Sequence, residues 1–346
     1  MNALRAVFKR QAGACADLDS PFMARLMGLF AARLAPGTAV ADRILGWEGD
    51  PSPLGDSVPL RIAGGLHALR RAGYPGLLAV YPPQEADDDM LWAAVMRAFE
   101  SESAHLLAWL DQPPQTNEVR RAAALIPALH LAAARFGMPV RLTEIGTSAG
   151  LNLRADAFHL EAGGESYGPA DAPVRLAPDW SGPTPRRAPV EVVARTGIDI
   201  APIDPEREGA RLLAYLWPDQ PDRIARTSAA IALARRIPAE IVAQDAADWL
   251  AGPGLAPVPG ALHLLFHTIA WQYLPADARA RGDALIAEAG ARATEEAPLA
   301  RFAMEAGTGG AALSLQLWPD GRRIDLGLAD YHGRWVRWSD DGGQIR

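Results

Sequence analysis

The sequence predicts an α/β fold in which an all-helical N-terminal region precedes a mostly parallel sheet. Residues 1–137 read mostly as helix, because apolar residues recur there at three- and four-residue spacing. From residue 138 onward, short apolar runs alternate with helical segments, which is typical of βαβ units. The last apolar runs follow one another with little helix between them, which predicts an antiparallel C-terminal hairpin on the parallel sheet.

The individual elements follow from local signals. Ser20 before Pro21 predicts a helix start, with the serine as N-cap and the proline in the first turn. Met138-Pro139 marks the change from helical to strand character, so we divide the chain into a helical cap at 1–137 and an α/β domain at 138–346. Pro319-Asp320-Gly321 predicts a tight turn. The seven predicted strands are 140–145, 190–198, 240–243, 261–266, 299–306, 311–318 and 324–331, the last extending toward residue 338.

Residues 156–189 interrupt this alternation. Gly163-Gly164 and several prolines predict a long irregular insertion there. Long loops of this kind are usually functional covers. We therefore expect the insertion and the helical cap to cover a ligand cleft and to exclude water from it.

Composition excludes several classes of protein. The chain has 346 residues, a formal net charge of −7 and a pI of about 5.6, which argues against general nucleic-acid binding and favours a small-molecule partner. The single cysteine, Cys15, excludes an intrachain disulfide and a cysteine-rich zinc site, and we expect no bound metal. No signal-peptide core and no apolar run of membrane-spanning length occurs, so we expect a cytoplasmic protein with no membrane partner.

The sharpest motif follows the first predicted strand. Residues 142–153 read LTEIGTSAGLNL, which is a strand that leads through Glu144 into a turn bounded by Gly146 and Gly150 and then into a helix. Glycines permit positive φ and a close approach of backbone to ligand. Ligands of open α/β sheets bind outside the carboxyl ends of the strands. A nucleotide-like ligand should therefore bind at this turn.

At these residues the chain resembles the class I S-adenosylmethionine-dependent methyltransferases, whose first motif is an acid, any residue, glycine and a short turn that ends in glycine. Glu144, Gly146 and Gly150 match it, and Ser148 stands where a middle glycine is common. The resemblance covers roughly residues 138–338. It implies a Rossmann-type sheet and S-adenosylmethionine as cofactor, with Glu144, Gly146, Ser148 and Gly150 at the methionine part.

The same resemblance assigns roles to residues at the ends of later strands. Asp199, after the second strand, would bind the ribose hydroxyls, with Asp204 as a competitor because the interval from Gly146 is longer than usual. Asp245, after the third strand, would lie at the adenine. These assignments imply methyl transfer from S-adenosylmethionine to a small molecule.

The candidate catalytic and substrate-binding residues come from two runs. The run HTIAWQY at 267–273 follows the fourth strand, and the run QTNEV at 115–119 precedes the last helix of the N-terminal region. The whole chain also resembles an uncharacterised bacterial family marked by these runs and the glycine turn. The predicted catalytic residues are His267, Glu118 and Tyr273, and the predicted substrate-binding residues are Asn117, Trp271 and Gln272.

Other readings of the same residues stay open. The turn is also a G-x-S-x-G sequence, so Ser148 could be the nucleophile of a serine hydrolase, with Asp245 and either His267 or His332 as partners. A non-catalytic module that binds a nucleotide-like ligand, or a partner, is a further alternative. A Rossmann dehydrogenase is disfavoured because the turn lacks the G-x-G-x-x-G spacing.

Overall fold

The computed structural model describes residues 2–53 and 55–339, and its contacts divide the chain into two compact units. The first unit combines Met1–Thr116 with Arg207–Ser228, and the second combines Asn117–Glu206 with Ala229–Arg346. The contacts thus place the boundary after Thr116 and not after residue 137, because residues 117–137 pack against the sheet. The later segment 207–228 also belongs to the helical unit by its contacts.

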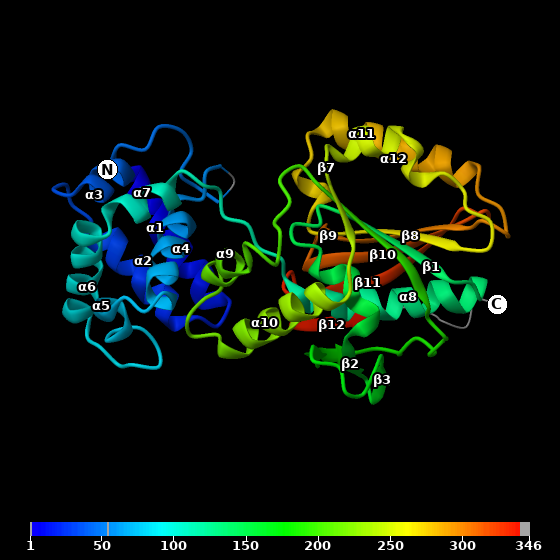
Figure 1. Ribbon diagram of the computed structural model, residues 1–346, viewed down its shortest axis with the longest axis horizontal. Coiled ribbons are helices and arrows are strands. Elements are labelled where there is room, and N and C mark those ends of the chain that lie inside the picture. The colour runs from blue at the N-terminus through cyan, green and yellow to red at the C-terminus, as the bar shows by residue number, and fades with distance from the viewer. Residues whose placement is uncertain (1, 54, 340–346) are drawn as a thin grey trace. The chain divides into compact units, whose positions relative to one another are not determined.

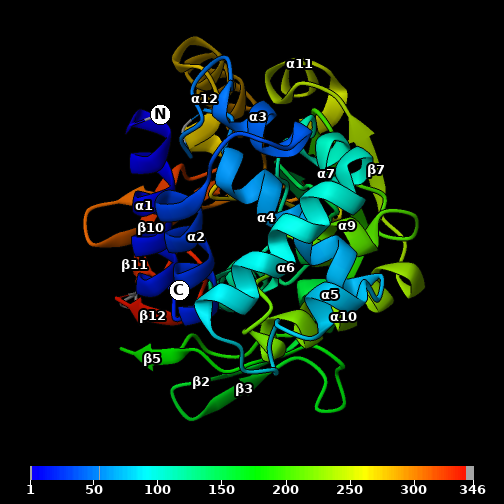
Figure 2. The same ribbon diagram turned by 90° about the vertical axis from the view of Figure 1, so that its left-hand side faces the viewer.

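The first unit is helical (Figure 1). It has its own apolar core. Helices α1 and α2 pack side by side, as Figure 2 shows. Ser20 is the N-cap of α2 as predicted, since its side chain accepts a hydrogen bond from the Met23 amide at 3.4 Å. Its helices are α1 (Asn2–Asp17), α2 (Pro21–Arg33), α3 (Ala39–Leu45), α4 (Val58–Arg71), α5 (Pro75–Leu78), α6 (Asp88–Ser101), α7 (Ser103–Leu110), α9 (Gly209–Ala214) and the start of α10 (Pro221–Arg236).

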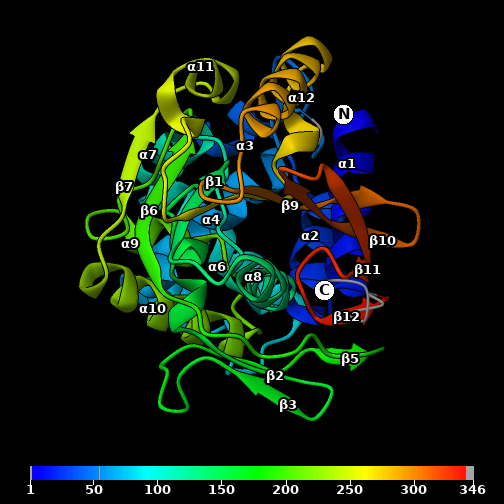
Figure 3. The ribbon, with the colours of Figure 1, turned by 90° about the vertical axis from the view of Figure 1, so that its right-hand side faces the viewer.

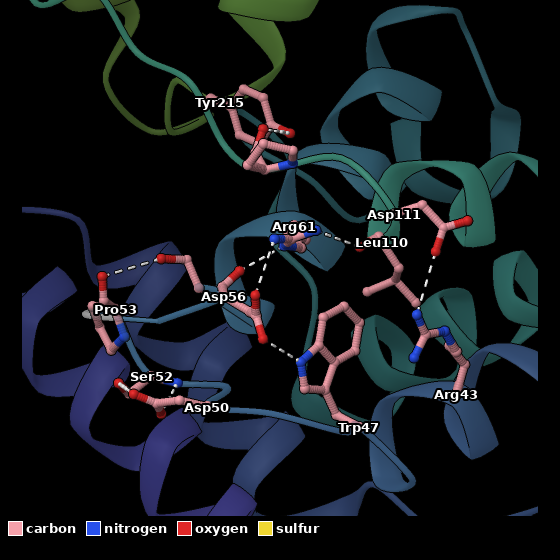
Figure 4. Close-up of polar contacts among 12 residues, drawn as sticks. Arg43, Trp47, Asp50, Ser52, Pro53, Asp56, Arg61, Leu110, Asp111 and Tyr215 are labelled. Carbon is pink, nitrogen blue, oxygen red and sulfur yellow. Dashed lines mark hydrogen bonds and ion pairs between the residues drawn. The ribbon is translucent and has the colours of Figure 1, made fainter. Parts of the chain in front are cut away.

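A polar cluster anchors the loop between α3 and α4 of this unit (Figure 4). Arg61, whose side chain is 9% exposed, donates to the carbonyl oxygens of Asp56 at 2.6 Å and Leu110 at 2.9 Å. The Trp47 indole donates to the Asp56 carboxylate at 2.9 Å, and the Arg43 guanidinium lies 4.5 Å above the Trp47 ring. A single buried guanidinium therefore connects the loop to the end of α7.

The second unit is built on one large, mostly parallel sheet with antiparallel strands at its C-terminal end. Among the described residues this sheet has nine strands in the order β5-β12-β11-β10-β9-β8-β1-β6-β7. The predicted number, seven, was wrong because β5 comes from the insertion and β12 is separate from β11. The strands are β1 (Val140–Ile145), β5 (Asp179–Ser181), β6 (Val192–Asp199), β7 (Glu240–Ala243), β8 (Leu262–Thr268), β9 (Leu299–Gly307), β10 (Gly310–Trp318), β11 (Arg322–Ala329) and β12 (Trp335–Trp338).

Helices cover both faces of this sheet. Helix α8 (Ala122–Phe136) packs on β8, β9 and β10 and is seen end-on in Figure 3 inside the curve of the sheet. Helices α11 (Ala246–Ala251) and α12 (Ala276–Ala291) cover the other face through a core that includes Ile145 and Leu265. Side chains alternate between the two faces along a strand. Glu144, which precedes Ile145, and Phe266, which follows Leu265, therefore point to the α8 face.

The insertion is more regular than predicted. It contains a small sheet of β2 (His159–Ala162), β3 (Glu165–Tyr167) and β4 (Arg175–Leu176), and it supplies β5 to the edge of the main sheet. The His130 ring of α8 lies 5.0 Å from the Tyr167 ring and hydrogen-bonds to the Ala188 backbone. The insertion thus packs along α8, and the expectation that it covers the glycine turn has no support in these contacts.

The Arg61 cluster makes a testable prediction about the helical unit. Arg61→Ala leaves the buried Leu110 carbonyl group and the partly buried Asp56 carbonyl group without their donor, so we expect the free energy of unfolding to fall by about 3 kcal/mol. Urea denaturation measures the change. The control is Arg25→Ala, which removes an exposed ion pair with Asp88 and should cost at most about 1 kcal/mol. Equal losses in the two variants would contradict the anchoring role.

Candidate functional site

The glycine turn after β1 folds back onto the end of β6. The amides of Gly146 and Thr147 both donate to the Ile198 carbonyl oxygen, at 2.8 and 3.1 Å. Gly146 and Gly150 have φ of +72° and +66°, as the sequence motif requires. A Cβ on Gly197 would approach the Thr147 side-chain oxygen to 2.6 Å, so only glycine fits beneath the turn. The helix predicted after the turn is a 3-10 helix, η2 (Leu151–Ala157).

Glu144 is buried beneath this turn. Its residue is only 2% exposed, and one carboxyl oxygen accepts a hydrogen bond from the Thr147 hydroxyl at 2.8 Å. Burial raises the pKa of Glu144 to about 8, although the Thr147 bond and the charges of Arg154 and Arg121 oppose the shift. At neutral pH the group is therefore mostly a neutral acid, and a bound cation would favour its ionised form.

Residues that precede α8 complete the surroundings of the turn. The Asn117 side-chain oxygen accepts from the Leu151 amide at 2.8 Å, and Asn152 donates to the Glu118 carbonyl at 3.2 Å. The Glu118 carboxylate accepts from the Arg120 amide at 3.1 Å and so caps η1 (Val119–Arg121). These contacts bring the predicted residues Asn117 and Glu118 to the glycine turn and give both of them a positioning role.

Two polar atoms at the turn are buried without a hydrogen-bond partner among the described residues. They are the Ser148 hydroxyl oxygen and the Asn152 side-chain oxygen. Buried polar groups are nearly always hydrogen-bonded, so such atoms mark a place where a ligand can supply the partner. Both atoms can accept hydrogen bonds, as can the Glu144 carboxyl group.

Asp199 ends β6 beside the turn, whereas Asp245 is engaged elsewhere. The Asp199 carboxylate accepts from the Ser148 amide at 2.8 Å through one oxygen and from the Ala201 amide at 2.9 Å through the other. Each oxygen keeps a second lone pair for a ligand. Asp245 is the N-cap of α11 and accepts from the amides of Ala247 and Asp248. Of the two predicted acids, the structure thus brings only Asp199 into contact with the turn.

His267 lies on the opposite face of the sheet from Glu144. Its Nδ1 is 2.7 Å from the Glu305 carboxylate, and its Nε2 accepts from Arg301 at 3.1 Å. Burial lowers the pKa of His267, and the Glu305 hydrogen bond only partly opposes that shift. The ring is therefore neutral with its proton on Nδ1, and both nitrogens are occupied.

The rest of the run 268–273 follows Glu305. This carboxylate accepts hydrogen bonds from the backbone amides of Ala270, Trp271 and Gln272 at 3.0 to 3.2 Å. Burial alone would raise the pKa of Glu305, but the His267 and amide hydrogen bonds outweigh it and hold the pKa below its usual value. Trp271 is buried and stacks on His267, and the Gln272 side chain accepts from the Ala306 amide. Tyr273 is 70% exposed. The structure thus gathers His267, Trp271 and Gln272 around Glu305 and not around Glu144.

The geometry of Ser148 bears on the hydrolase alternative. Its φ of +52° agrees with a strained strand-to-helix turn, as a nucleophile elbow requires. Its hydroxyl, however, has no hydrogen-bond partner among the described residues, so no histidine is placed to take its proton. The required base is missing from the described arrangement.

Three residues at these sites were not predicted from the sequence. Glu305 lies near the C-terminal end of β9, where no sequence motif marks it, and only the fold brings it to the 268–273 turn. Buried Arg154 donates to the Gly150 carbonyl oxygen at 2.6 Å and holds the turn from behind. Ile200, directly after Asp199, is 79% exposed. The sequence could have indicated it, because an apolar residue follows an acid at the end of a predicted strand.

The fold and site define a class of protein: an open α/β protein with a buried polar site at the carboxyl end of β1. Within that class the chain belongs to a family described as an uncharacterized protein conserved in bacteria, DUF2332, whose profile matches residues 5–338. No curated protein matches the chain. None of the helices in the described part of the chain is long and apolar enough to cross a membrane. Likewise, no cluster of metal-ligating side chains occurs among residues 2–53 and 55–339.

The raised pKa of Glu144 predicts a pH dependence of stability. The folded state keeps a proton that the unfolded state has lost between pH 4.5, the ordinary pKa, and about 8. Glu144 therefore stabilises the fold fully below pH 4.5, and this contribution is lost as the pH rises toward about 8. The slope is at most about 1.4 kcal/mol per pH unit.

The comparison is with Glu144→Gln, whose neutral amide can keep the Thr147 hydrogen bond. The free energy of unfolding of both proteins is measured at several pH values between 5 and 8, roughly the window of the pKa shift. The difference between the two proteins removes the contribution of the buried histidines, which both contain. We expect the wild type to lose stability relative to the variant as the pH rises. Parallel curves would show that Glu144 is ionised in the folded protein.

Proposed function

We propose that the second unit binds S-adenosylmethionine at the turn after β1 and transfers its methyl group to a small molecule. The observation that carries the proposal is the position of Glu144 at a reversal of strand order. The chain passes from β1 outward to β6 and β7 and then returns to β8 on the other side of β1. Open α/β sheets bind ligands outside the carboxyl ends of the strands at such a reversal.

The polar atoms at the turn fit the cationic part of this cofactor. Glu144, Ser148 and Asn152 offer oxygens that accept hydrogen bonds, and the hydroxyl of Ser148 and the amide oxygen of Asn152 lack partners among the described residues. An ammonium group supplies donors and a positive charge, and both favour the ionised form of Glu144. The proposal therefore assigns Glu144, Ser148 and Asn152 to the amino end of the methionine part.

The end of β6 fits the nucleoside part. The second lone pairs of the Asp199 carboxylate can accept hydrogen bonds from two ribose hydroxyls. The exposed side chain of Ile200 offers an apolar surface beside that carboxylate for a flat base. Asp245 takes no part in this assignment because its carboxylate caps α11.

S-adenosylmethionine would supply an electrophilic methyl group, so the protein's task is mainly to hold the acceptor in line. Asn117 and Glu118 position the turn by their contacts to it. The catalytic roles of His267, Glu118 and Tyr273 stay predictions, and so do the substrate contacts of Trp271 and Gln272. A non-catalytic binding module would use the same turn, and only the formation of methylated product separates the two functions.

Binding is tested by calorimetric titration with S-adenosylmethionine and, separately, S-adenosylhomocysteine. We expect Ile200→Ser to weaken the affinity about tenfold, because it removes an apolar surface from the nucleoside side. The variant should fold normally, since the side chain is exposed. Val193→Ser, at an exposed position within β6, is the control and should leave the affinity unchanged.

A second variant tests the turn itself. A Cβ on Gly146 would lie 2.4 Å from the Ala270 side chain, and φ there is +72°, so Gly146→Val should abolish binding. Circular dichroism must show that this variant folds. Absence of binding by the wild type to either ligand would remove the cofactor assignment.

Proton release on binding tests the role of Glu144. At pH 7 the pKa of about 8 keeps Glu144 mostly protonated, and a bound ammonium group should lower that pKa. Binding should therefore release close to one proton, seen as a dependence of the binding heat on the ionisation enthalpy of the buffer. Glu144→Gln should lose this dependence. A wild-type heat that is the same in every buffer would contradict the assignment.

A further inference from the structure

The α12 face of the sheet contains a hollow that the proposed function does not use. Its volume is about 350 Å³, which is in the range of small-molecule sites. Strands β8 to β11 form its floor, and Asp283 of α12 forms part of its wall. It belongs entirely to the second unit, and it lies on the face opposite to Glu144.

The hollow exists because no helix connects β9 to β10, in contrast to the strand-helix-strand connections earlier in the sheet. Strand β9 ends at Gly307 and β10 begins at Gly310, so a tight turn joins them and no helix returns across this face. Helix α12 reaches β9 and β10. Beyond it, the polar side chains of β9 and β10 are half-buried and Arg323 of β11 is exposed. A rung of side chains crosses these strands, since Gln316 pairs with Arg301 on one side and Arg323 on the other.

The two carboxylates of the hollow already have partners within the protein. Glu305 accepts from His267 and from three backbone amides, and Asp283 pairs with Arg301 at 2.8 Å. Arg301 also donates to His267. Arg301 thus balances Asp283, and the His267 and amide hydrogen bonds occupy the Glu305 carboxylate.

Each of the remaining polar groups can donate a hydrogen bond. Arg323 is 65% exposed and has only a loose ion pair with Asp325 at 3.6 Å, a kind worth little. Within the described chain, the side chains of Ser314 and Gln316 make no hydrogen bond, and the buried indole N–H of Trp271 has no acceptor. Beside these donors the floor is apolar at Ala303, Ala306 and Ala312.

We infer that this hollow binds a small organic acid. Its carboxylate or phosphate meets Gln316 and Arg323, and its apolar part lies on the three alanines. Both kinds of oxyanion match the donors, and a guanidinium binds either one through paired N–H groups. The site is independent of S-adenosylmethionine, because its residues lie on the other face of the sheet and are complete without the cofactor.

The test uses the full chain without cofactor, labelled with ¹⁵N-tryptophan, and two probes, benzoate and inorganic phosphate. The ten tryptophans give separate indole signals, and Trp271 is assigned from the signal lost in Trp271→Phe. We expect benzoate to shift the Trp271 signal with saturation. Arg323→Gln should weaken this binding about tenfold, as the loss of one charge-assisted contact predicts. Gln316→Ala should act in the same direction.

The matched control is Arg322→Gln, one residue away on the same strand. Arg322 pairs with buried Leu317 on the α8 face, so the variant makes the same change of charge on the other side of the sheet. Benzoate affinity should be unchanged in it. Equal weakening in both variants, or no saturable shift of Trp271 with either probe, would overturn the inference. Tighter binding of phosphate than of benzoate would overturn the role of the alanine floor.

Discussion

The return of the glycine turn onto the end of β6 is the contact on which the proposed cofactor site depends. Two successive amides, of Gly146 and Thr147, share the Ile198 carbonyl oxygen. That geometry requires positive φ at Gly146, and it requires Gly197 to have no side chain. Thr147 then lies over Gly197 with its hydroxyl directed to Glu144. A carboxyl group that would otherwise face an apolar layer thus receives one donor and stays buried.

The connection between β9 and β10 has an equally large effect on the other face. A helix between these strands would bury their α12-facing side chains, and apolar residues would be needed there. With a direct turn, alternate residues of β9 and β10 are polar or small, whereas their buried neighbours on the α8 face are Phe302, Met304, Leu313 and Leu315. The same alternation that forms the core under α8 therefore places arginine, serine and glutamine side by side in the hollow.

The sequence predicted the order of elements and the glycine turn, because both depend on local patterns. Strand β8 is one apolar run bounded by turns, and Gly146 and Gly150 need positive φ wherever the chain goes next. The insertion was missed as a sheet because β2 to β5 are short, and their pairing, including that of β5 with β12, joins distant segments. No local period records such pairing. The boundary after Thr116 was missed for the same reason, since α8 looks like any other helix until it packs on β8.

The predicted site residues also divide into those placed by local contacts and those placed by the pairing of distant strands. Asn117, Glu118, Ser148 and Asp199 meet at the turn, where hydrogen bonds between side chains and backbone within the second unit fix each of them. His267 was predicted from its place after the fourth strand, but which face of the strand it occupies is set by the register with β1. His267 follows Phe266, which lies on the same face as Glu144, so His267 points to the other face and toward Glu305. The Glu305 carboxylate in turn holds the amide of Ala270, whose side chain faces Gly146. The turn after β8 therefore borders both the glycine turn and the hollow.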